Sequence, residues 1–158
     1  MLRHKDTGIL FEWGAIALIL LTMLMFGCHF GQPQHGDMVF VETQTGKRVA
    51  FKVEVARTAQ QQQKGLMERE YLDKNSGMVF LHHPPDFVSM WMKNTQISLD
   101  MIFISSHGII SKIAKNTVPY SRAIISSEDQ VAAVLEINAG LSDEYGFKPG
   151  DKVEFGFD

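Results

Sequence analysis

The chain has 158 residues, of which 45% are hydrophobic and 21% charged, a composition typical of one globular domain with a short appendage. The formal net charge of -3 gives no reason to expect nucleic acid as a partner. The single cysteine, Cys28, excludes an internal disulfide framework and a cysteine-based zinc site.

Residues 1–27 are predicted to be a signal peptide or a membrane anchor that is not part of the globular fold. The run from Trp13 to Phe26 contains no charged residue. As a helix it would reach about 21 Å, which is less than the roughly 30 Å hydrocarbon core of a bilayer. That length favours the core of a signal peptide, and a single-pass anchor is the alternative.

The only cysteine follows this segment directly. Gly27-Cys28 resembles the end of a bacterial lipoprotein signal, in which the cysteine thiol takes a diacylglyceryl group. The alternative is an unmodified Cys28 at the end of an uncleaved anchor. Both predict a membrane-tethered domain outside the cytoplasm, on the periplasmic side or at the cell surface.

Residues 28–37 are rich in glycine, proline and glutamine and are predicted to form a tether, followed by a single β-rich domain over 38–158. In the segment 48–55, apolar residues alternate with charged ones, which is the period of a half-buried antiparallel strand. Further strands are predicted where apolar runs lie between turn residues, at 38–42, 78–81, 87–92, 97–104, 109–114, 131–137 and 153–157.

One helix is clearly indicated. Thr58 with Gln61 three residues later predicts an N-cap with a capping box, and Gly65 predicts the C-cap. The glutamine run 60–63 is then the solvated face of this helix, and a second helical turn is predicted within 138–146.

Two segments are predicted to be loops: 82–86, because of its prolines, and the long polar stretch 117–130. About eight strands with one or two short helices favour a mainly β fold, an antiparallel sandwich or a jelly-roll-like barrel. No βαβ alternation is visible, which argues against a doubly wound parallel sheet. Because adjacent side chains on an extended chain point apart, His82 and His83 do not predict a metal site, and no cofactor is expected.

Several motifs, in this order, resemble the domain of unknown function 192 family: Gly65-Leu66-Met67 with Arg69, Gly77-Met78-Val79-Phe80, Trp91-Met92-Lys93-Asn94-Thr95, Leu99-Asp100, Val134 to Gly140, and Gly150 to Val153. The resemblance covers nearly everything after the tether. It implies a β-rich, jelly-roll-like sandwich, often preceded by a signal peptide or lipoprotein signal. It implies no established activity, so no catalytic residue is carried over.

The stretch from Met90 to Ile104 has the strongest functional signal, because a polar turn with a tryptophan lies between two apolar runs. Trp91 could stack on a ring, and Lys93, Asn94 and Thr95 could bind polar groups. We therefore predict a binding site for a small ligand or an envelope protein at Trp91 to Asp100. The alternative is that these side chains only pack the core and the turn.

Asp100 and Glu136 are carboxylates within apolar strands and are the basis of a second hypothesis. As neighbours they could form an acid/base pair of the glycosidase type, which would make the protein an envelope hydrolase. The favoured alternative is a structural role, in which Lys93 or Arg69 neutralises Asp100 in an ion pair. No nucleophile motif or phosphate-binding loop is visible, so an enzyme is not favoured.

Overall fold

This computed structural model describes residues 36–157, which contain seven strands and two short helices. In chain order they are β1 (Met38–Glu42), β2 (Arg48–Ala56), α2 (Ala59–Lys64), β3 (Ser76–Met90), β4 (Leu99–Ile104), β5 (Ile110–Ala114), β6 (Ile125–Asn138), α3 (Leu141–Tyr145) and β7 (Lys152–Phe155). The prediction of a mainly β domain with short helices is confirmed. The predicted signal or anchor segment and Cys28 lie outside the described residues. Among those described, no helix is long and apolar enough to cross a membrane.

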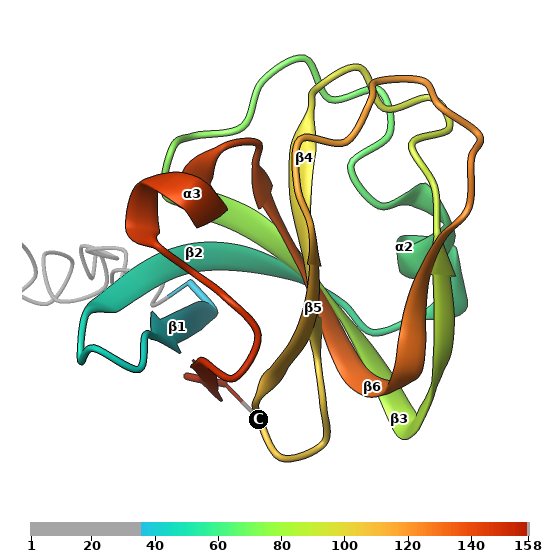
Figure 1. The fold of residues 1–158 in the computed structure, drawn as a ribbon. Coiled ribbons are helices and arrows are strands. Elements are labelled where there is room, and N and C mark those ends of the chain that lie inside the picture. Colours follow the sequence, from blue (N-terminus) through green and yellow to red (C-terminus); the bar gives the residue numbers. More distant parts are fainter. Residues whose placement is uncertain (1–35, 158) are drawn as a thin grey trace, which may run out of the picture. The chain divides into compact units, whose positions relative to one another are not determined.

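All seven strands belong to one curled sheet in the order β5-β4-β6-β3-β2-β1-β7 (Figure 1). In place of the predicted antiparallel sandwich or jelly-roll-like barrel, the domain has a single curled sheet. Strong strand twist lets such a sheet curl around a core instead of covering it with a second sheet. The curl brings its outer strands together: the Ile110 amide donates to the Asp151 carbonyl at 2.9 Å, and the Val153 amide donates to the Gly108 carbonyl at 2.7 Å.

One strand pair is parallel, which the sequence pattern did not indicate. β2 and β3 run parallel and are connected through α2, whereas the other pairs in the sheet are antiparallel. A parallel pair requires a crossover connection, and the short α2 provides it. The sheet is still not doubly wound, because this crossover occurs once within the described residues.

Two strands are longer than predicted. β3 continues through the prolines at 84 and 85, where a register shift between Leu81 and Asp86 accommodates them against β6. Such irregularities are where a strand tolerates proline, so the predicted loop at 82–86 is wrong. β6 begins at Ile125, inside the predicted 117–130 loop, because Ile125 and Ser126 pair with the end of β3.

The predicted helix ends are confirmed. Thr58 Oγ1 accepts from the Gln61 amide at 3.2 Å, and Gln61 Oε1 accepts from the Thr58 amide at 2.9 Å, which completes the capping box. Gly65 ends α2 at a φ of 47°. The predicted helical turn in 138–146 is α3.

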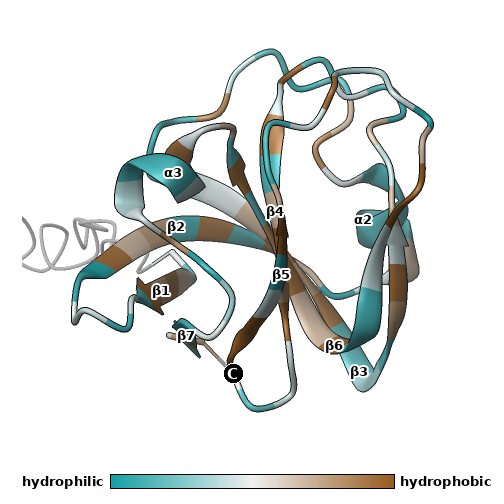
Figure 2. Cartoon of the chain, in the orientation of Figure 1, coloured by the Kyte–Doolittle hydropathy of each residue, from teal (hydrophilic) through white to brown (hydrophobic). Residues whose placement is uncertain are grey.

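Apolar side chains form two clusters, one on each face of the sheet. Figure 2 shows hydrophobic residues along the strands, whereas α2 is hydrophilic. The first cluster lies on one face and includes Phe51, Ile102, Leu135 and Phe147. The second lies on the other face and is listed here by its largest members: Leu66, Leu72, Met78, Phe80, Met92, Leu99, Met101 and Phe103. All six residues of β4 are buried, which confirms the prediction of a strand covered on both faces.

Candidate functional site

Asp100 is a buried structural carboxylate. Its Oδ1 accepts from the Asn116 amide at 2.8 Å, and its Oδ2 accepts from the Ser142 amide at the start of α3 at 2.9 Å. Two backbone donors satisfy the carboxylate and fix α3 to the sheet. The predicted ion pair with Lys93 or Arg69 is wrong, since Arg69 instead pairs with Glu54 on β2 at 2.7 Å.

Asp100 and Glu136 lie on opposite faces of the sheet. In the β4–β6 ladder Asp100 pairs with Ile137, while Glu136 pairs with Met101, so the two carboxylates are offset by one residue. Successive side chains of a strand point to opposite faces. Asp100 therefore belongs to the face of the first apolar cluster and Glu136 to that of the second. The hypothesis of an acid/base pair is wrong, because the sheet separates its members.

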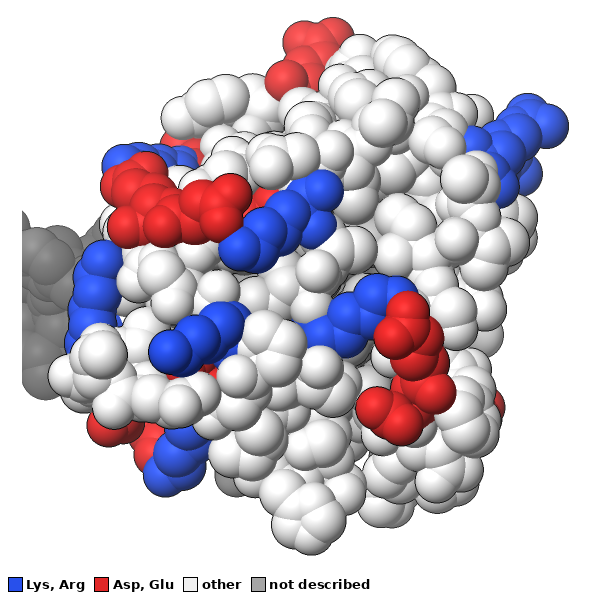
Figure 3. Space-filling view, in the orientation of Figure 1, with Lys and Arg blue, Asp and Glu red and all other residues white. Residues whose placement is uncertain are grey.

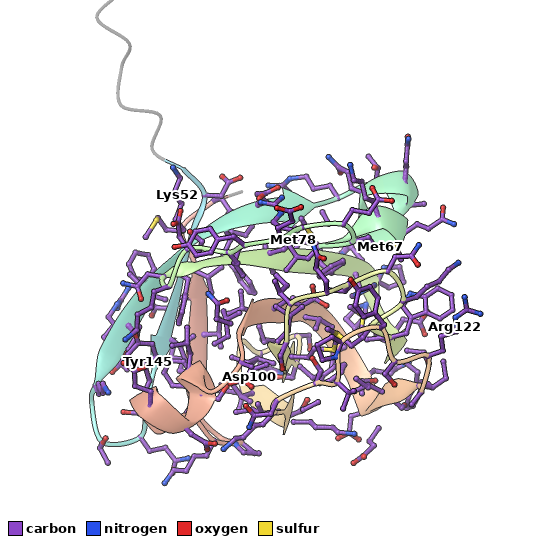
Figure 4. All side chains as sticks on the ribbon, turned by 90° about the horizontal axis from the view of Figure 1, so that it is seen from above. Lys52, Met67, Met78, Asp100, Arg122 and Tyr145 are labelled. Carbon is purple, nitrogen blue, oxygen red and sulfur yellow. The ribbon has the colours of Figure 1, made fainter. Side chains whose placement is uncertain are left out.

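Glu136 lines a cavity of about 200 Å³, called here the Glu136 cavity. β3, β6, α2 and the turns that follow α2 and β3 form its walls. The lining residues are Gln62, Gln63, Lys64, Gly65, Leu66, Met67, Phe80, Ser89, Met90, Trp91, Thr95 and Glu136. In Figure 4, Met67 lies near α2, whereas Asp100 lies near α3.

The carboxyl group of Glu136 has no hydrogen bond or ion pair with any residue of the described part of the chain. Only 4% of the residue is exposed, and its neighbours across the strands, Met78 and Met101, are apolar. Burial raises the pKa of Glu136 to about 8. A carboxylic acid that stays neutral at pH 7 can both donate and accept hydrogen bonds.

Some of the residues predicted to form a binding site at the Trp91 turn line the Glu136 cavity, and others do not. Trp91, 44% exposed, and the buried Thr95 both line the Glu136 cavity. Lys93 lies outside the lining with its Nζ 5.4 Å from the centre of the Trp91 ring. Asn94 has a φ of 54°, and its carbonyl accepts from the Glu68 amide at 2.8 Å, so it holds the turn against the segment after α2. Arg69 lines other cavities, not this one.

The sequence interpretation missed the α2 side of the cavity. The sequence pattern predicts Gln62 and Gln63 to lie on a solvated helix face, and it predicts no site role for Lys64, Leu66 or Met67. One available signal was the motif Gly65-Leu66-Met67, which belongs to the same family resemblance as the Trp91 turn. Spacing alone could not show that the two motifs face the same cavity, because 22 residues lie between Met67 and Met90.

Charges of both signs are interspersed over the visible face of the molecule (Figure 3). Many are paired, as in Lys115 with Asp143 at 2.6 Å and Lys74 with Glu144 at 2.6 Å. No group of three or more His, Cys, Asp or Glu side chains within residues 36–157 could hold a metal ion.

Comparisons with known proteins identify the family to which the chain is similar. The model of the DUF192 family, described as "Uncharacterized ACR", matches residues 40–155, which confirms the resemblance drawn from the motifs. A crystal structure of a protein of unknown function from Novosphingobium aromaticivorans DSM 12444 is 46% identical, with a TM-score of 0.72 over 74% of this chain and 83% of that one. A structure from Sinorhizobium meliloti 1021, titled a "putative transcription regulator", is 43% identical, with a TM-score of 0.74 over 75% and 92%. No curated protein matches this chain.

Proposed function

This chain belongs to the DUF192 family, and we propose that it is a binding domain that takes a small ligand, or a side chain of a partner protein, into the Glu136 cavity. The observation that carries this proposal is the carboxyl group of Glu136, which lines the cavity, is only 4% exposed and has no hydrogen bond or ion pair with any of residues 36–157. Within residues 36–157, the fully enclosed side-chain atoms without a hydrogen-bonding partner are His82 Nε2 and Ser142 Oγ, so the Glu136 carboxyl group stays accessible from the cavity. A ligand that hydrogen bonds to Glu136 would supply the missing partner.

The other lining residues suit recognition of a small organic molecule. The half-exposed ring of Trp91 offers an apolar face at the entrance, and Phe80 and Leu66 provide buried apolar walls. Thr95 and Gln63 add groups that hydrogen bond. Ligand cavities commonly combine such apolar walls with a few polar groups.

Nuclear magnetic resonance of the full-length chain, with fragment mixtures of small amines, amides, sugars and carboxylates, tests this proposal. We expect fragments to shift the amide signals of cavity residues, and Trp91→Ala to weaken their binding by about 2- to 10-fold, since one aromatic contact is lost. Phe87→Ala is the matched control, because Phe87 is an exposed aromatic residue outside the lining. Fragments that bind only elsewhere, or equally to both variants, would contradict the site.

We also propose that the domain is tethered to a membrane outside the cytoplasm. Support comes from the uncharged run Trp13 to Phe26 and from Gly27-Cys28 after it. Intact mass of the membrane-extracted protein from a lipoprotein-processing host tests this. Loss of residues 1–27 with an acyl addition on Cys28 establishes a lipoprotein, and an unmodified full-length mass in the membrane fraction establishes an anchor. Recovery of the full-length protein in the soluble fraction would refute the tether.

A transcriptional role, as in the Sinorhizobium title, is not proposed for this chain. A net charge of -3 gives no electrostatic footprint for DNA.

A further inference from the structure

Three buried carboxylates occur in the described residues, and two of them are fully explained by the fold. Asp100 accepts from two backbone amides. Asp151 does the same, from Gln44 at 3.0 Å and Lys148 at 2.9 Å. Glu136 is buried to a similar degree but accepts no such bond. Backbone amide donors therefore explain why Asp100 and Asp151 are buried, but they do not explain why Glu136 is buried.

Several groups around Glu136 can interact favourably with a cation, and Lys64 is the one cationic residue of the lining. Phe80 and Trp91 contribute aromatic rings, and Met67 and Met90 contribute polarisable thioethers. Aromatic faces attract cations through their quadrupole, and Trp91 already has the Lys93 ammonium 5.4 Å from its ring centre. An ammonium would supply hydrogen-bond donors and the charge that favours the ionised form of Glu136, whereas an anion would favour its neutral form.

We propose that the Glu136 cavity binds an aliphatic ammonium group, with Glu136 as its counter-ion and hydrogen-bond acceptor. This inference rests on the proposed function and names the chemistry of its ligand. The ammonium can belong to a free alkylamine or to a lysine side chain of a partner. A cavity of about 200 Å³ is smaller than the roughly 300–1,000 Å³ typical of drug-sized ligands, so a short aliphatic chain fits it.

Binding is coupled to release of a proton. The neutral Glu136 carboxyl loses its proton to solvent and the resulting carboxylate pairs with the ammonium, so charge and atoms balance. Below the pKa of about 8 that burial gives Glu136, affinity increases as the pH rises, by up to about tenfold per pH unit. The only other ionisable residue in the lining is Lys64 on α2. The lining residues from β3, which are Phe80, Ser89 and Met90, have no ionisable group.

The test is a set of nuclear magnetic resonance titrations of the full-length chain at pH 6 and pH 7. The probes are n-butylammonium, its neutral analogue n-butanol, the anion butyrate, and Nα-acetyl-lysine amide. We expect n-butylammonium to shift the signals of Leu66, Trp91 and Glu136, and to bind up to about tenfold more tightly at pH 7 than at pH 6. Glu136→Gln keeps the size of the side chain but removes the charge, so affinity should fall at least tenfold and lose its pH dependence. Glu70→Gln, at an exposed position outside the lining, is the matched control and should change neither.

Each outcome decides a separate point. Stronger binding of Nα-acetyl-lysine amide than of n-butylammonium assigns the ligand to a lysine side chain, and weaker binding assigns it to a free amine. If n-butanol or butyrate shifts the cavity signals as strongly as n-butylammonium, or if Glu136→Gln binds n-butylammonium normally, the inference fails while the cavity remains a binding site. If none of the four probes shifts the cavity signals, both the inference and the proposed function fail.

Discussion

Replacing Glu136 with glutamine should make the protein more stable at neutral and alkaline pH. In the fold, the carboxyl group is buried among Met78, Met101 and the cavity walls and has no partner within residues 36–157. Ionising it there is unfavourable because the charge loses its hydration. Glu136→Gln preserves the shape and removes the titration.

The magnitude follows from the two pKa values. Burial raises the pKa of Glu136 from an ordinary 4.5 to about 8. The folded state therefore holds a proton that the unfolded state has lost over this range, and the free energy of unfolding falls as the pH rises. At about 1.36 kcal/mol per pH unit, the loss between pH 5 and pH 8 is at most about 3.5 kcal/mol. Water that enters the Glu136 cavity would reduce this value.

The assay is urea unfolding at half-unit steps between pH 5 and pH 8, for the wild type, Glu136→Gln and the exposed control Glu70→Gln. We expect the difference in unfolding free energy between wild type and Glu136→Gln to change steadily with pH, while Glu70→Gln follows the wild type. Other groups that titrate in this window cancel in the difference. One of these is His82, whose pKa is lowered chiefly by burial. Parallel pH profiles for the wild type and Glu136→Gln would refute the reasoning.

Two further substitutions test the structural roles described above. Asp100→Asn should destabilise the fold by about 2–4 kcal/mol in urea unfolding, because the asparagine side chain replaces one of the two acceptor oxygens with an NH2 donor and so cannot accept from both the Asn116 and Ser142 amides. It should leave binding in the Glu136 cavity unchanged, since Asp100 lies on the other face of the sheet. Gly77→Ala should cost about 1–3 kcal/mol in thermal or urea unfolding, because its Cβ would lie 2.5 Å from the Glu136 carbonyl oxygen.

Asp129 and Ser76 provide the control positions for these two variants. Asp129→Asn changes an exposed aspartate by the same chemistry and should stay within about 0.5 kcal/mol of the wild type. Ser76→Ala alters the residue before Gly77 and should have a similarly small effect. An Asp100→Asn variant as stable as Asp129→Asn would contradict the structural role of Asp100, and a stable Gly77→Ala variant would contradict the close approach of β3 to β6.

Local chemistry made the short-range features predictable. Thr58 and Gln61 predict their own capping box, because both partners of the hydrogen bonds lie within one turn. The alternation of Phe51, Val53 and Val55 predicts β2 for the same reason, since the period of a strand is visible along the chain itself. The string of motifs predicted the family, which the match over residues 40–155 confirms.

Features that depend on pairing were not predictable in the same way. Ile125 to Gln130 is polar and irregular, yet it is strand because it extends the ladder between β6 and β3. The prolines at 84 and 85 are tolerated because a register shift lets β3 resume its pairing at Asp86. No local pattern carries this information, since the partner strand lies about 40 residues away.

The sequence by itself determined that Asp100 and Glu136 are carboxylates within buried strands, and that Trp91 stands beside a polar turn. Only the tertiary structure decided what each carboxylate does. Alternation along a strand fixes which side chains share a face, but the register between two strands decides which of them become neighbours. A register that pairs Asp100 with Ile137 places Asp100 against the amides that begin α3, and it leaves Glu136 on the opposite face, in the cavity that Trp91 and Thr95 also line.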